Sequence, residues 1–334
     1  MIVRLLWPVL LFPVLAPCQP PRVGIIDFYG LRKVSEQKIR KALEIKEGDP
    51  LPVSKSDVEE RIEKISGVVR ARLEAVCCEA GKAILFVGIE EKGAPHFDFR
   101  TPPSGEVALP REVVEAFDEF FVLLETAVRI GDTSEDISQG HSMAANSQVR
   151  GVQERFLILA EEHEKALRDV LRNAAAGRQR AIAAHLLGYA PVKRRVADDL
   201  QYAMQDSDDG VRNNAMRALI AFAELAKRDP ERGLRVSPTW FIEMLNSIIW
   251  TDRNKSAAAL SGLTEDRDPK VLAQLRERAL PSLVEMARWK SLGHALPAFL
   301  IVGRLAGLPE AEIQSAWSKG DREAVIAKAL KDKR

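Results

Sequence analysis

The feature that most constrains the fold is a weak repeat in the second half of this 334-residue chain. The stretch "RAIAAHLL" begins at Arg180, "RNNAMRAL" begins 32 residues later at Arg212, and "RNKSAAAL" begins 41 residues after that at Arg253. Each arginine is followed, at helical spacing, by a small residue and then by a leucine. Small residues let paired helices approach closely and leucines fill the space between stacked pairs, so this period predicts an α-solenoid.

The central copy resembles a known repeat family. "VADDLQYAMQ" followed by "DSDDGVRNNAMRALIAF" resembles a HEAT repeat, with the family's aspartate turn and Val-Arg opening. The copies at Arg180 and Arg253 are degenerate, and the helices from Pro281 onward match less well. The resemblance implies a protein-binding scaffold, although a minority of related repeats lie in enzymes. We assign residues 112–334 to this helical domain, and the alternative is a single non-repetitive helical domain.

The aspartates of that central copy also suggest a calcium loop, but the spacing is wrong. The glycine at position 210 comes one place early, and Arg217 stands where the twelfth position needs a glutamate. We expect Asp208 or Asp209 to cap a helix instead.

The N-terminal part has a different pattern, which predicts a strand, two helices and two further strands. An apolar strand ends before Gly30, one helix is capped by Ser35, and a second helix begins at Ser54. The alternating stretch "VVRARLEAV" and the apolar "KAILFVGIEE" then form a hairpin. A phosphate-binding loop needs several glycines or a Gly-Lys-Ser/Thr ending, and a lone Gly30 provides neither.

Residues 22–92 resemble a POTRA domain, the polypeptide-transport-associated module of outer-membrane assembly and secretion proteins. The matching stretches, in the family's order, are "IIDFYGLRKVSEQKIRKAL", "IKEGDPL", "GVVRARLEA" and "ILFVGIEE". The resemblance implies a small β-α-α-β-β fold in the periplasm that binds extended polypeptide by adding a strand to its sheet edge, with no catalysis. The candidate edge strand is Val69–Val76, whose Arg70 and Arg72 suit an acidic or polar ligand. The expected fold class is therefore α+β, with this domain followed by the all-α repeats.

Residues 1–18, "MIVRLLWPVLLFPVLAPC", have the character of a secretory signal. Arg4 precedes an uncharged run that is too short for a membrane-spanning helix and is interrupted by prolines. We expect cleavage after Cys18 and a mature chain in the periplasm or cell envelope. Lipid attachment at Cys18 and an uncleaved anchor remain the alternatives.

Residues 93–111, rich in proline and glycine, read as a linker between the two domains. Cys77 and Cys78 are adjacent, and the spacing of about 3.8 Å between neighbouring α-carbons disfavours a disulfide between them without backbone distortion. The formal net charge of +1 argues against a surface built to bind nucleic acid.

The loop from Gly131 to Gln148 is the most polar stretch, with Asp132, Glu135, Asp136 and His141 between two helices. It has no HxxxH or HxxE spacing, so no catalytic, metal-binding or cofactor-binding residue is assigned. A local basic cluster is expected to be a solvated helix face, with an acidic partner or anionic lipid as the second interpretation. Its members are Arg178, Arg180, Lys193, Arg194 and Arg195.

The sequence thus predicts an exported, non-enzymatic scaffold of the bacterial envelope. The POTRA-like domain is expected to bind polypeptide, and the helical repeats a second protein, with envelope or outer-membrane proteins as the partners. No small-molecule substrate, cofactor or nucleic acid is predicted, and peripheral membrane association is left open. The alternative is an enzyme or metal-dependent regulator that uses the acidic loop around His141.

Overall fold

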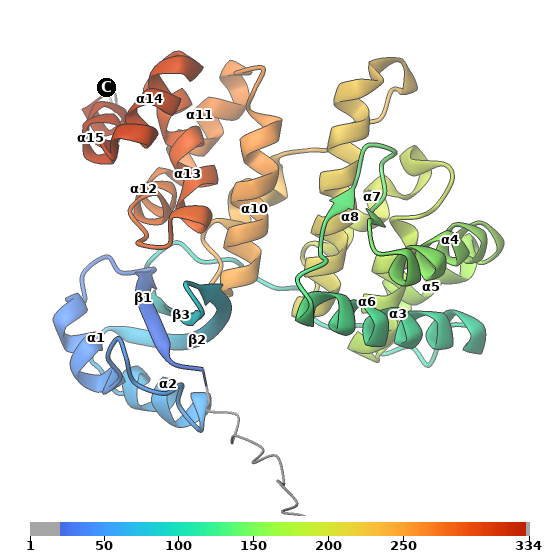
Figure 1. The fold of residues 1–334 in the computed structure, drawn as a ribbon, viewed down its shortest axis with the longest axis horizontal. Helices are drawn as coiled ribbons and strands as arrows, with labels where there is room; N and C mark the ends of the chain where they lie inside the picture. The colour runs from blue at the N-terminus through green and yellow to red at the C-terminus, as the bar shows by residue number, and fades with distance from the viewer. Residues whose placement is uncertain (1–20, 332–334) are drawn as a thin grey trace, which may run out of the picture.

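The computed structural model describes residues 21–331 and contains a small sheet domain followed by an array of helices (Figure 1). The leader, with Cys18, lies outside the described residues. The elements of the sheet domain are β1 (Val23–Tyr29), α1 (Glu36–Leu43), α2 (Lys55–Glu63), β2 (Val68–Glu79) and β3 (Lys82–Glu91). This is the order that the sequence predicts. The strands lie in the order β1-β3-β2, with β1 parallel and β2 antiparallel to β3.

The helices α1 and α2 cover one face of this sheet. Their apolar positions Ile39, Leu43, Val58 and Ile62 are buried in a cluster with alternate side chains of the three strands. Apolar side chains that recur about every 3.6 residues along the helices pack against alternate side chains of the strands. A single small core therefore forms on this side of the sheet.

The remaining elements form the helical part. They are α3 (Arg111–Arg129), β4 (Glu135–Asp136), β5 (Met143–Ala144), α4 (Ser147–Glu162), α5 (Glu164–Asn173), α6 (Gly177–Leu187), α7 (Lys193–Ala203), α8 (Asp209–Arg228), the 3₁₀ turn η1 (Pro230–Arg232), α9 (Thr239–Met244), α10 (Trp250–Leu263), α11 (Pro269–Arg278), α12 (Leu280–Ala287), α13 (Leu292–Leu305), α14 (Glu310–Lys319) and α15 (Arg322–Lys331). No helix within residues 21–331 is long and apolar enough to cross a bilayer.

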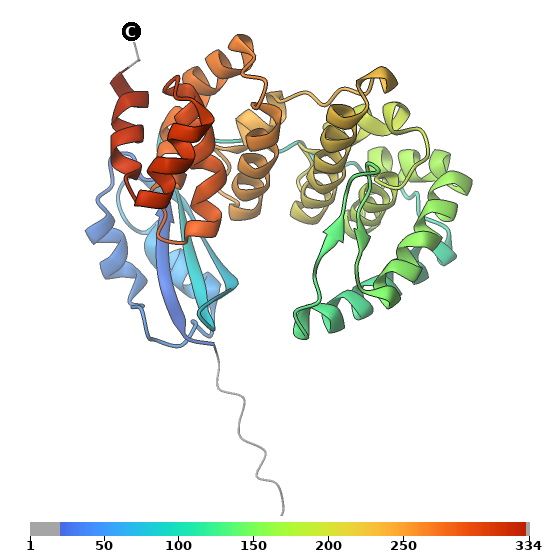
Figure 2. The same cartoon turned by 45° about the horizontal axis from the view of Figure 1, so that its top comes forward.

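Most of these helices stack as a two-layer array. In one layer α6, α8, α10 and α13 contact one another in turn, and α5, α7, α9 and α12 pack against them as sequential neighbours. Figure 2 shows the array curving as an arch, with the sheet in blue beneath its C-terminal helices in orange and red. The chain is therefore an α+β protein whose helical part is a repeat solenoid, as the sequence predicts.

The repeated arginines have one role in all three copies. Arg180 Nη1 donates to the carbonyls of residues 174 and 175, and Arg212 Nη1 donates to those of residues 206 and 207. Arg253 Nε donates to the carbonyl of residue 247, also just before its own helix. The exposed fractions are 1%, 1% and 3%, respectively. Each arginine thus satisfies carbonyls of the turn that enters its helix, and buried polar groups need such partners.

The second face of the sheet packs against the C-terminal helices. Phe86 lies with its ring centroid 4.9 Å from those of both Trp250 and Trp289. Tyr29 Oη donates to the carbonyl of Ile248 at 2.8 Å. The carboxylate of Asp27 accepts from the backbone N–H groups of residues 290 and 291. The sheet is thus held between α1 and α2 on one side and the end of the helical array on the other.

Residues 93–111, called the strap below, lie extended across α9 and two turns of the array. Phe97 packs edge-to-face against Trp240 of α9. The backbone N–H of Arg100 donates to the carbonyl of Gln205, between α7 and α8. Gly105 pairs through its N–H and C=O with the turn between α5 and α6, where an added Cβ would lie 2.5 Å from a backbone oxygen. The strap is therefore fixed along its length, and it leads the chain back to the first helices of the array.

The expectation for Cys77 and Cys78 was wrong, because the two are joined in a disulfide. The peptide bond between them is cis, and their α-carbons lie 3.1 Å apart, closer than the spacing of about 3.8 Å across a trans peptide. The N-cap expectation is confirmed, because the side chain of Asp208 accepts a hydrogen bond from the N–H of Val211 at 3.0 Å.

Candidate functional site

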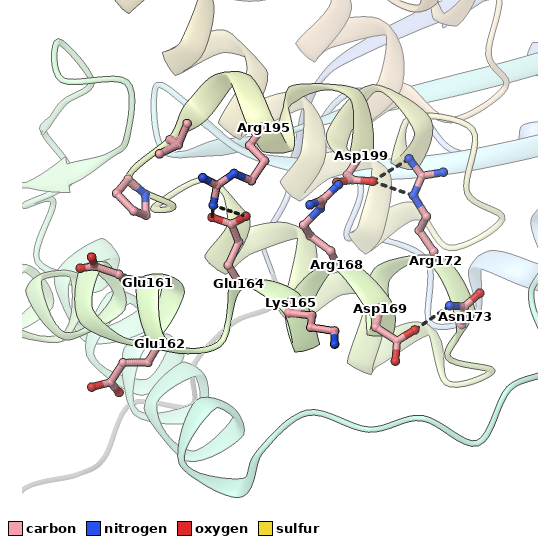
Figure 3. A pocket seen from close by; sticks show the side chains of 12 residues that line it. Glu161, Glu162, Glu164, Lys165, Arg168, Asp169, Arg172, Asn173, Arg195 and Asp199 are labelled. Carbon is pink, nitrogen blue, oxygen red and sulfur yellow. Dashed lines mark hydrogen bonds and ion pairs between the residues drawn. The ribbon is translucent and has the colours of Figure 1, made fainter.

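A recess, called the cleft below, lies between α5 and α7 (Figure 3). These two helices lie in the part of the array away from the sheet (Figure 1). The cleft has a volume of about 760 Å³ and is open to solvent. Charged side chains of both signs line it, with two apolar residues at one end. The lining residues are Glu161, Glu162, Glu164, Lys165, Arg168, Asp169, Arg172, Asn173, Pro191, Val192, Arg195 and Asp199.

Two arginines share one carboxylate in the floor of this cleft. Arg168 Nε donates to one oxygen of Asp199 at 2.5 Å, and Arg172 donates to the other at 2.6 Å. The side chain of Asp199 is 4% exposed, whereas those of the arginines are about two-fifths exposed (41% and 39%). Figure 3 shows both guanidinium groups reaching α7 from α5. The trio carries one surplus positive charge, and each guanidinium keeps N–H donors that bond to nothing within residues 21–331.

Neighbouring charges extend the cleft on either side of this trio. Arg195 Nη1 lies 3.2 Å from both carboxylate oxygens of Glu164, so α7 and α5 are linked a second time. Arg172 also stacks over the ring of Tyr202, whose other contact is the strap residue Arg100. The strap and the cleft are therefore joined through one aromatic ring.

The basic cluster expected around Arg178–Arg195 is not a single surface. Arg178 pairs with Asp118 of α3, and Arg180 is buried against Asp206. Lys193 is buried and donates to the carbonyl of Gly188, and burial lowers its pKa to about 7. Of these side chains only Arg195 lines the cleft. These residues are close in sequence but do not form one surface, because successive residues of a helix point in different directions.

The acidic loop does not bring its predicted side chains together. Glu135 forms an ion pair with Arg217 of α8, and the carboxylate of Asp132 accepts from Asn146. The ring of His141 lies 5.7 Å from that of Tyr189, and burial, aided by the charge of Lys193, lowers its pKa to about 4. Within residues 21–331 no three His, Cys, Asp or Glu side chains are grouped so as to hold a metal ion.

The outer edge of β2, the predicted site of strand addition, is already occupied. The N–H of Ala71 donates to Glu63 Oε1 at 2.9 Å, and the N–H of Leu73 donates to Glu59 Oε1 at 2.7 Å. Both carboxylates come from α2. Because N–H groups alternate between the two sides of a strand, those of Arg70 and Arg72 point towards β3. The two carboxylates thus take the place of the backbone carbonyls of a neighbouring strand, and they block the edge over this stretch.

The opposite edge of the sheet is also covered. The N–H of Val23 donates to the carbonyl of Asp49, and its carbonyl accepts from Gly48. Further along β1, the carbonyl of Phe28 accepts from the indole N–H of Trp289 at 3.2 Å. Such coverage is a common protection of sheet edges against unwanted pairing.

Comparison with known proteins gives only distant structural similarity. No family model matches the chain, and no curated protein matches it. Among solved structures, computationally designed armadillo repeat proteins for modular peptide recognition match with a TM-score of 0.37 and 14% identity, over 56% of this chain and 93% of that one. The designed armadillo repeat protein YIII(Dq)4CqI matches with a TM-score of 0.34 and 14% identity, over 58% of this chain and 97% of that one. The assignment to the helical-repeat class therefore rests on the helix packing described above.

Proposed function

We propose that the chain is an exported, non-enzymatic scaffold of the bacterial cell envelope, whose helical array holds a partner protein. The POTRA-like sheet serves as a second attachment point for an extended polypeptide. Support for export comes from the leader, and support for the second attachment point comes from the resemblance of residues 22–92 to POTRA domains.

The observation that carries the binding role is the cleft between α5 and α7. Arginine is enriched among the residues that dominate protein interfaces, because its fixed fork of donors can bind a carboxylate or several carbonyls at once. Arg168 and Arg172 are held in place by Asp199 and yet keep free donors facing solvent. A partner's acidic side chain or carbonyl can bind there without first ordering a flexible arginine, which lowers the entropic cost of binding.

Strand capture at β2 requires one additional step. A ligand strand that pairs with Ala71 and Leu73 must displace the carboxylates of Glu59 and Glu63. We therefore assign the primary contact to the helical array and the sheet edge to a second, conditional contact.

The proposal is tested by replacing Arg168 with alanine and measuring capture of partners from native envelopes by cross-linking and mass spectrometry. Arg172 still holds Asp199 in this variant, so the fold should be kept. The matched control is Arg288→Ala, since Arg288 is also a half-exposed arginine paired with a glutamate of another helix, Glu323. We expect wild type and Arg288→Ala to capture the same envelope protein, and Arg168→Ala to capture much less of it. Equal capture by all three proteins would contradict the assignment to this cleft.

A further inference from the structure

A second recess lies between α8 and α10, where the outer layer of the array is thin. The chain between those helices contains only the 3₁₀ turn η1 and the six-residue α9, whereas α8 has 20 residues. The recess has a volume of about 480 Å³. We call it the α8–α10 groove.

The floor of this groove is apolar. Ile220 and Leu263 come from the two facing helices, Val236 from the loop before α9, and Ile137 from the loop after β4. Alanines on both helices and one glycine on α10 keep the floor wide. A Cβ added at Gly262 would meet nothing within 4 Å, although the residue lies within α10. The groove therefore has room for an apolar side chain that the array itself does not supply.

The rim of the groove is acidic. Three carboxylates line it, those of Glu224, Glu265 and Asp266, against the single ammonium group of Lys227. Lys227 pairs with Glu265 across the opening, and Arg228 pairs with Glu224 from outside the lining. Lys227 and Arg228 thus offset two of the three carboxylates, and the remaining negative charge of the rim lies at the α10 end, on Asp266.

From this combination we infer that the α8–α10 groove binds a partner polypeptide that inserts an apolar side chain beside a lysine or arginine. Burial of the apolar side chain against Ile220 and Leu263 removes apolar surface from water and so provides affinity. The partner's cation takes a place beside Asp266, whose negative charge no lysine or arginine of the groove offsets, and this sets the direction of the bound segment and selects against acidic segments. This inference rests on the proposed scaffold function and assigns a second contact surface and the chemistry of its ligand.

The test uses a fluorescent amphipathic peptide of leucine and lysine, with a leucine–glutamate peptide of the same pattern for comparison, and anisotropy as the readout. Gly262→Trp fills the groove, and Gly151→Trp is the matched control, because Gly151 is also helical with open space at its Cβ but lies in α4. The variant Glu265→Gln/Asp266→Asn removes the rim charge without changing its shape.

We expect the leucine–lysine peptide to bind wild type and Gly151→Trp alike, and Gly262→Trp to bind at least about tenfold more weakly. The variant Glu265→Gln/Asp266→Asn should bind the leucine–lysine peptide more weakly, and its binding should depend less on the salt concentration. The inference is overturned if the basic peptide does not bind wild type, if Gly262→Trp binds it normally while folded, or if the acidic peptide binds equally well. Failure of the scaffold function is a separate result, in which native envelopes yield no partner that depends on Arg168.

Discussion

Arg212 Nε lies 3.1 Å from both carboxylate oxygens of Asp252, and the two side chains are each 1% exposed. This buried ion pair joins α8 to α10, the step at which the outer layer is thinnest. The same arginine holds carbonyls of the turn before α8, so one side chain fixes both the entry of its own helix and the next repeat. Burial raises the pKa of Asp252, and the positive charge of Arg212 opposes that rise.

Replacing Arg212 with methionine should strongly destabilise the chain. Asp252 would stay buried without its cation, and breaking such a pair costs about 3–5 kcal/mol in the free energy of unfolding. Urea unfolding followed by circular dichroism measures this loss. The double variant Arg212→Met/Asp252→Leu should regain much of the lost stability, because no unpaired charge is left. A single variant as stable as wild type would show that the pair does not hold the repeats together.

His185 should make the chain less stable in mild acid. Its ring is packed among Phe117, Phe120 and Tyr189, with Nε2 buried and unpartnered, and burial lowers its pKa to about 3. The unfolded chain takes up this proton near pH 6.5, whereas the folded chain does not, so the free energy of unfolding should fall as the pH drops below 6.5. One such group contributes a slope of about 1.4 kcal/mol per pH unit.

The check is urea unfolding across this pH range for wild type and His185→Phe. The phenylalanine continues the aromatic cluster and cannot be protonated, so its stability should depend less on pH by about that slope. Identical pH dependence in the two proteins would mean that His185 gains its proton as easily when folded as when unfolded.

Glu59 and Glu63 should protect the edge of β2 from pairing with other strands. Replacing both with alanine frees the N–H groups of Ala71 and Leu73 and leaves a bare strand edge. Such edges pair with other strands, so the double variant should self-associate or bind extended peptides more readily. Sedimentation velocity at increasing protein concentration measures this. If the variant stays as monomeric as wild type, the two carboxylates do not protect the edge.

The sequence predicted the parts of the fold that depend on local pattern. The order of the sheet domain followed from turn and cap residues such as Gly30 and Ser54, and the solenoid followed from the spacing of Arg180, Arg212 and Arg253. The burial of those arginines was not foreseen, because a sequence does not show that the carbonyls of the preceding turn lie within reach.

What the sequence did not predict depends on contacts between distant segments. Trp289 and Phe86 are 203 positions apart and meet only because the sheet packs against the last repeats. The strap read as a linker because proline and glycine suit loops and extended segments equally. The bond from the N–H of Leu73 to Glu59 likewise follows from the packing of α2 beside β2.

The central claim, that the α5–α7 cleft holds a partner protein in the envelope, is tested most directly by photo-cross-linking at Val192. This side chain lines the cleft, is 44% exposed and forms none of its ion pairs. A photoreactive residue there should link the chain in living cells to one envelope protein, and Arg168→Ala in the same chain should abolish the product. Cross-links to lipid alone, or a protein product that persists with Arg168→Ala, would contradict the account.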